Sequence, residues 1–168
     1  HGVKTRIFTG YRPCKTGPHQ LRSTYQQQRQ FLRHNGRENT CPRQAFDQDI
    51  LHEIKNSRLN GERVVLMLDA NQDVRRGDLT TSLQDLGLRD AILSHHRTLP
   101  APATHCSGSV PIDAIFVSSE IPIVSGSWLG GHQSPGDHRA GVIDIPWKAL
   151  LGEDLLRITR PQARQLSC

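Results

Sequence analysis

The chain has 168 residues, 35% of them apolar, and a formal net charge of +5. This length suits one domain with a sizeable core. No apolar stretch approaches the roughly 20 residues of a bilayer-spanning helix, which excludes an integral membrane protein of that kind.

Positive charge is concentrated in the first part of the chain. Residues 1–68 hold twelve Lys and Arg against five Asp and Glu, whereas residues 69–168 hold nine against eleven. A polyanion such as nucleic acid would be attracted to the basic half through a salt-sensitive, largely sequence-independent interaction. A solvated helical surface gives the same composition, and the sequence leaves both interpretations open.

The four cysteines are scattered and form no Cys-x-x-Cys pair: Cys14, Cys41, Cys106 and Cys168. This pattern favours reduced thiols and argues against a structural zinc site. Three histidines near Cys106 (His95, His96 and His105) are interpreted as surface residues of a polar loop. The chain opens on no basic-then-apolar signal segment, so we expect an intracellular protein, nuclear or cytoplasmic.

The first elements are predicted from periodicity. Residues 3–11 alternate loosely and end at Arg12-Pro13, which indicates a strand followed by a turn. Residues 19–34 carry a narrow apolar stripe and predict a polar helix. A second helix is expected from Pro42 to the Asn-Gly pair at residues 60–61.

Residues 64–71 form the longest apolar run and end in polar side chains, which predicts a central strand covered on both faces. Side chains alternate along a strand, so Asp69 and Asn71 should project to one side. Open α/β sheets place their ligand crevice at such strand ends. An Asx-rich turn is the alternative explanation of the same residues.

The second half is predicted to contain a short helix capped by Asp78, apolar packing over residues 88–93, and a polar loop over residues 94–109 that allows a short strand near Thr104. Strands are expected at residues 112–118, 121–128 and 142–145, with a turn at 130–136. A short helix and a basic tail should follow Trp147.

Polar residues therefore accompany three apolar strands. The segments are Leu-Asp-Ala-Asn at residues 68–71, Pro-Ile-Asp-Ala-Ile-Phe-Val-Ser at 111–118, and Gly-Asp-His-Arg at 136–139. In this order they resemble the C-terminal motifs of the endonuclease/exonuclease/phosphatase superfamily, the deoxyribonuclease I-like and exonuclease III-like phosphodiesterases. The family patterns are Gly-Asp-Phe-Asn, Ile-Asp-Tyr-Ile-Phe and Ser-Asp-His.

The resemblance implies four catalytic residues. Asp69 would orient or deprotonate the attacking water, and Asn71 would hold that water or a phosphate oxygen. His138 would contact the phosphate and stabilise the developing charge. Asp113 would accept the proton on the other ring nitrogen of His138 and fix its tautomer. Each of these residues also has a structural alternative, such as pairing with an arginine or capping a loop.

Two more residues follow from the resemblance. Tyr11, in Tyr-Arg-Pro, resembles a family tyrosine that lies near the scissile phosphate, although a strand-end Tyr is also common in packing. Tyr11, Asn71 and His138 would together contact the phosphate. Asp137 would help to hold a divalent cation, Mg²⁺ or Mn²⁺.

The family fold is a four-layer α/β sandwich of two facing β-sheets flanked by helices. We expect residues 1–147 to form the C-terminal portion of such a domain, with one sheet, its helices and one strand of the other sheet, and 148–168 a basic tail. The family's upstream Asn and metal-binding Glu have no counterpart before Glu38. We therefore expect a chain truncated at its N-terminus, with an apolar sheet face where the missing half or a partner docks.

The expected function is a metal-dependent phosphodiester hydrolase, an endonuclease or exonuclease acting on nucleic acid; retroelement-associated endonucleases share this architecture and form one candidate subgroup. The first alternative is an inositol or lipid phosphatase of the same superfamily. The second is a non-catalytic, nucleic-acid-binding remnant without the metal. The sequence leaves the substrate and the oligomeric state open.

Overall fold

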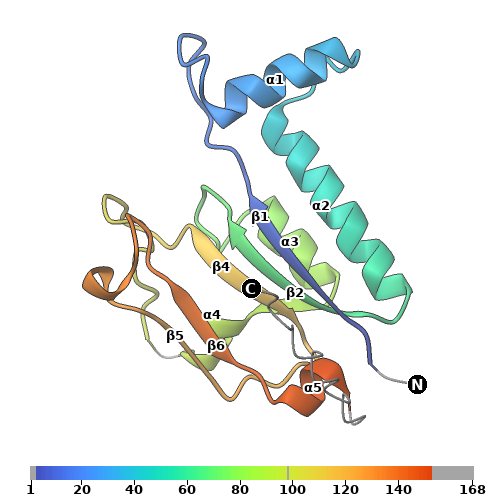
Figure 1. The fold of residues 1–168 in the computed structure, drawn as a ribbon, viewed down its shortest axis with the longest axis vertical. Coiled ribbons are helices and arrows are strands. Elements are labelled where there is room, and N and C mark those ends of the chain that lie inside the picture. Colours follow the sequence, from blue (N-terminus) through green and yellow to red (C-terminus); the bar gives the residue numbers. More distant parts are fainter. Residues whose placement is uncertain (1–2, 98, 153–168) are drawn as a thin grey trace, which may run out of the picture.

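The computed structural model describes residues 3–97 and 99–152 and has a mixed α/β fold (Figure 1). Its main sheet has the strand order β1-β2-β4-β3. These strands are β1 (Thr5–Tyr11), β2 (Arg63–Asp69), β3 (Leu88–Asp90) and β4 (Asp113–Ser118). β1 runs parallel to β2, whereas β4 is antiparallel to both β2 and β3. The predicted α/β class is confirmed.

Helices cover one face of this sheet. Alternate residues of β2 (Val64, Leu66 and Leu68) are buried there because successive strand residues point to opposite faces. They pack against Ile54 of α2 (Pro42–Leu59) and Leu83 of α3 (Asp78–Asp85). A further helix, α1 (Thr24–His34), packs on α2 and extends beyond the sheet (Figure 1).

A second, two-stranded sheet lies on the other face. It consists of β5 (Ser125–Trp128) and β6 (Gly141–Asp144), and it shares a core with α4 (Ala91–His95). The core joins Val65, Ile115 and Val117 of the main sheet to Ile92 of α4 and Ile143 of β6. The chain therefore contains two strands of a second sheet, where the sequence indicated one.

Part of this second face is uncovered. Ile7 is 58% exposed and Met67 is 42% exposed, and the β1–β2 register places them on the same side as the buried Val65. The prediction that the central strand is covered on both faces is thus wrong at its C-terminal end. The small second sheet packs over β4 and leaves the β1 side open, which matches the expected apolar sheet face.

Some predicted boundaries are wrong for local reasons. The first helix starts at Thr24 rather than residue 19, because Ser23 accepts the N–H of Gln26 and caps the helix there. Asp78 is the first residue of α3 and not its cap, since Gly77 with φ 103° occupies the cap position. β5 begins only at Ser125.

Other boundaries agree with the sequence. α2 begins at Pro42 and is closed by Asn60, with Gly61 at φ 70° in the left-handed region. The short helix expected after Trp147 is α5 (Trp147–Leu151). The rest of the predicted tail, residues 153–168, lies outside the described residues. Among the described helices, none is both long and apolar enough to cross a bilayer.

Asp90 generates a stability prediction. Its carboxylate accepts the N–H groups of Ile92 and Leu93 at 2.9 Å and caps α4, and burial raises its pKa to about 6. Because the folded pKa lies above the unfolded value, ionisation of Asp90 opposes folding as the pH rises from about 4 to about 6. Asp90→Asn keeps the cap and removes the charge.

We expect the free energy of unfolding of the wild type to fall relative to that of Asp90→Asn across this pH window, by about 1–3 kcal/mol. Urea unfolding from pH 4 to pH 8 measures the difference. Parallel stability curves for the two proteins would contradict the burial argument.

Candidate active site

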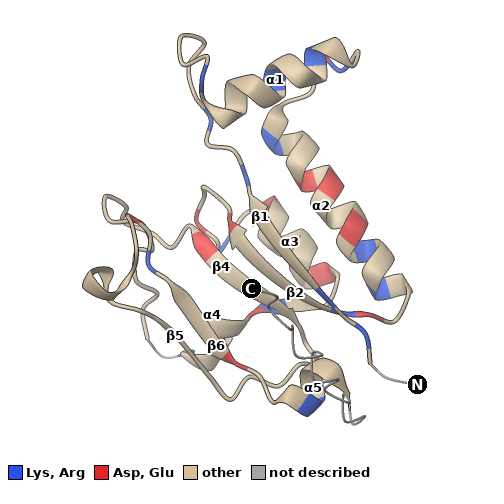
Figure 2. Ribbon diagram, viewed as in Figure 1, with Lys and Arg blue, Asp and Glu red and all other residues tan. Residues whose placement is uncertain are grey.

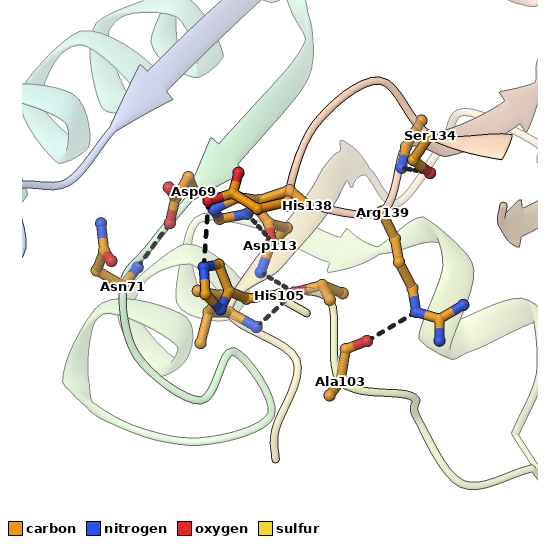
Figure 3. Close-up of polar contacts among 12 residues, drawn as sticks. Asp69, Asn71, Ala103, His105, Asp113, Ser134, His138 and Arg139 are labelled. Carbon is orange, nitrogen blue, oxygen red and sulfur yellow. Dashed lines mark hydrogen bonds and ion pairs between the residues drawn. The ribbon is translucent and has the colours of Figure 1, made fainter. Parts of the chain in front are cut away.

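Two carboxylates face each other where β2 ends and β4 begins. Asp69 is the last residue of β2 and Asp113 the first of β4, and the antiparallel register pairs them directly. Paired residues of neighbouring strands project to the same face. The structure thus brings together two predicted residues that are 44 positions apart, on the partly uncovered side of the sheet (Figure 3).

His138 completes this cluster from a distant loop. Its Nδ1 lies 2.8 Å from Oδ2 of Asp113. Asp69, Asp113 and His138, which we call the inner cluster, offer ligand atoms within 4.8 Å of one another. The bond to Asp113 anchors Nδ1 of the ring and leaves Nε2 for a substrate. His138 is about one third exposed, so solvent reaches the ring.

The environment shifts two pKa values in this cluster. Burial, followed by the charge of Asp113, raises the pKa of Asp69. Burial alone would lower the pKa of His138, but its hydrogen bond to Asp113 and the charges of Asp69 and Asp137 outweigh burial and raise it. A carboxylate with raised proton affinity beside a readily protonated imidazole is a pairing suited to proton transfer.

Asn71 holds the end of the strand. Its backbone adopts φ 47°, its N–H donates to Oδ1 of Asp69 at 3.0 Å, and its side-chain Nδ2 donates to the carbonyl of Arg12 at 2.8 Å. These contacts match the Asx-turn alternative. Asn71 lies beside Asp69 (Figure 3), and its contact with water or phosphate stays a prediction.

Tyr11 and Arg12 bring the end of β1 to the same place. Tyr11 pairs with Asp69 in the β1–β2 register and is 48% exposed on the same face. The guanidinium of Arg12 is almost fully buried and donates to Asp47 of α2 and to Gln72. The sequence did not predict these contacts of Arg12, which tie the ends of the strands to α2.

Asp137 lies at the outer edge of the site. Its side chain is 70% exposed, and its Oδ2 is 3.4 Å from Nε2 of His105. The ring of His105 in turn contacts that of His138 edge-on, with centroids 4.9 Å apart. The interpretation of His105 as a surface loop residue is therefore wrong: it is half-buried and belongs to the site.

Thr104 explains why this loop is ordered. Its side chain is fully buried, and Oγ1 accepts the N–H groups of Ile112 and Asp113 at 2.9 and 3.1 Å. His105 forms an antiparallel bridge with His138, which matches the short strand that the sequence allowed near Thr104. That short strand was the one signal that could have placed His105 in the site.

A groove of about 400 Å³ opens beside the inner cluster. Asp69 and Asp113 line one part of it, and Met67, Trp128 and Arg139 line the rest. A larger hollow of about 480 Å³ lies between α1 and α2 and includes no residue of the cluster. The groove, rather than the larger hollow, is lined by residues of the inner cluster, Asp69 and Asp113.

The donor set can be tested against the Mg²⁺ that the resemblance implies. Mg²⁺ is usually bound by one or two carboxylates, with waters and substrate phosphates completing six oxygen ligands. The exposed carboxylate of Asp137 can supply one such ligand at the mouth of the site. The described residues fit a cation held in this way, although two imidazoles nearby are atypical for Mg²⁺.

A comparison of the sequence with protein-family models and with curated proteins finds no match to either. Function is therefore inferred from the geometry of the site and from the motifs.

The His138–Asp113 contact generates a prediction. Because Asp113 contributes both a hydrogen bond and a charge that raise the pKa of His138, Asp113→Asn should lower that pKa. NMR titration of the His138 ring protons measures the change. Asp73→Asn, which removes a carboxylate paired with Arg75 and Arg76, is the matched control and should leave His138 unchanged. An unaltered His138 titration in Asp113→Asn would contradict the geometry.

Proposed function

We propose that this chain belongs to a metal-dependent phosphodiester hydrolase, an endonuclease or exonuclease that cleaves nucleic acid. The observation that carries the proposal is the inner cluster, in which Asp69, Asp113 and His138 meet with a 2.8 Å His–Asp contact. Phosphodiester hydrolysis needs an activated water and neutralisation of the charge that develops on phosphate. The cluster offers a group for each need.

Asp69 has a raised pKa and lies beside the open groove, so it suits the part of general base toward water. His138, anchored at Nδ1, directs Nε2 toward the phosphate and stabilises negative charge on it when protonated. Asp113 fixes the tautomer of His138 and supports its positive charge. Mg²⁺ bound at Asp137 would supply further charge neutralisation at the phosphate oxygens.

The choice of nucleic acid over a small phosphate ester rests on the charge of one segment. Residues 15–37, the basic segment, contain five Lys and Arg and no Asp or Glu: Lys15, Arg22, Arg29, Arg33 and Arg37. None of the five forms an ion pair within the described ranges. The segment includes α1 and follows directly on the end of β1 at the site (Figure 2).

An unpaired cationic segment of this length suits a polyanion with repeating phosphates better than a single headgroup. It leads away from the end of β1, where Tyr11 is paired with Asp69, so phosphates that flank the cleaved one could contact it.

One observation favours a second candidate, the non-catalytic nucleic-acid-binding protein. The basic segment, which has no ion-pair partner among the described residues, would serve such a protein without any contribution from the inner cluster. Binding of nucleic acid without Mg²⁺-dependent cleavage would select this candidate. Release of phosphate from inositol phosphates without cleavage of nucleic acid would instead select a phosphatase.

Plasmid nicking tests the hydrolase proposal. We expect nicking by the wild type with Mg²⁺ and none with EDTA. His138→Ala should reduce the rate about 100-fold or more, because it removes the group placed at the developing charge. His132→Ala is the matched control, since His132 is exposed in the 3₁₀ turn (Gly131–Gln133) outside the cluster. Equal rates for His138→Ala and wild type would refute the assigned role.

The basic segment generates a separate prediction about binding. Arg29→Gln/Arg33→Gln should weaken binding of a DNA duplex in EDTA and reduce the magnitude of the slope of log K against log salt by about 0.9 for each phosphate that the variant no longer binds. Lys55→Gln removes an exposed charge from α2 outside the segment and is the control. Fluorescence anisotropy at several salt concentrations measures both. An unchanged slope in the double variant would exclude the segment as a phosphate-binding surface.

A further inference from the structure

His105 is a titratable group beside the inner cluster to which the mechanism above gives no part. Its ring is anchored at one nitrogen, because Nδ1 accepts the backbone N–H of Ser107 at 3.1 Å. In the neutral ring the proton therefore lies on Nε2. Nε2 faces the exposed carboxylate of Asp137 at 3.4 Å, a long contact for a hydrogen bond. The Nε2–H thus has a fixed direction but forms only a weak hydrogen bond.

His105 and His138 are both anchored at Nδ1, although the Nδ1 of His105 accepts a hydrogen bond and that of His138 donates one. His138 is anchored at Nδ1 by Asp113 at 2.8 Å, and His105 by the N–H of Ser107 at 3.1 Å. Their rings touch edge-on, and their backbones form a bridge that fixes the two residues side by side (Figure 3). Two imidazoles, each with Nε2 left over, therefore lie next to each other at the mouth of the site.

A transition-metal site is the other chemistry that this group could support. His105, Asp137 and His138 offer ligand atoms within 4.8 Å of one another, and two imidazoles with a carboxylate suit Zn²⁺. The anchoring of His105 argues against it. With Nδ1 accepting the Ser107 N–H, Nε2 carries the proton and has no lone pair for a metal. A metal at this position would require that hydrogen bond to break.

We propose that His105 is a further catalytic residue, whose Nε2–H donates to a non-bridging oxygen of the phosphate bound at His138. This inference rests on the proposed phosphodiester hydrolysis. Because Asp137 is mostly exposed and its contact with His105 is long, a phosphate oxygen can replace it as the acceptor. His138 would then supply charge and His105 an oriented neutral donor to the same phosphate.

Two substitutions separate donation from packing. His105→Gln keeps an N–H donor, whereas His105→Phe keeps an aromatic ring against His138 and removes the donor. We expect His105→Phe to lower kcat/KM for plasmid nicking with Mg²⁺ about 10-fold, the usual effect of one hydrogen bond. His105→Gln should stay within about threefold of wild type. The matched control, His95→Phe, changes an exposed histidine of α4 and should have no effect.

A binding readout keeps the test independent of turnover. Inorganic phosphate, titrated with Mg²⁺ present, should shift the NMR signal of the His105 ring Nε2 in the wild type. The absence of that shift would overturn the proposal, even in a protein that proves inactive. If the wild type nicks plasmid but His105→Phe nicks equally well, the proposal also fails while the hydrolase assignment stands. Micromolar Zn²⁺ binding that is abolished in His105→Phe would overturn it in favour of the metal site.

Discussion

The direct opposition of Asp69 and Asp113 across β2 and β4 is the constraint on which the site depends. Like charges in facing positions of two strands destabilise a sheet. The structure offsets this repulsion with the ring of His138, which bonds to Asp113, and with a raised pKa at Asp69 that disfavours its charged form. The charge of Asp113 contributes to the raised pKa of both Asp69 and His138, so removal of Asp113 should lower both pKa values.

This opposition is imposed by the core beneath it. Leu66 pairs with Phe116 in the same β2–β4 register, and both are fully buried. A slip of one residue would turn Phe116 out of the core, and it would also separate the two carboxylates. The hydrophobic pattern thus sets the geometry of the polar cluster. Thr104 adds a local restraint, since its hydroxyl fixes the backbone at Asp113 where the strand begins.

The sequence was informative where local rules decide the structure. Alternation and a strand end located Asp69, and the motif resemblance pointed to Asp113 and to the loop that carries His138. Local rules cannot reveal contacts between residues far apart in the chain. The ion pair between Arg12 and Asp47 joins residues 35 positions apart. The backbone bridge between His105 and His138 joins residues 33 positions apart, and no strong strand pattern in the sequence predicts it. The bond from the side chain of Asn71, a residue with positive φ, to the carbonyl of Arg12 likewise joins residues 59 positions apart.

Two kinds of electrostatics are spatially separated in this molecule. In the inner cluster the charges are in contact and partly buried, so salt screens them little. The basic segment is largely exposed and has no ion-pair partners among the described residues, so its attraction for a polyanion falls off over about 8 Å at physiological ionic strength. Added salt should therefore weaken capture of nucleic acid while it leaves the His138–Asp113 contact intact. If saturating substrate restores the cleavage that is lost at high salt, the salt acts on binding. If the loss persists at saturating substrate, the salt acts on the inner cluster.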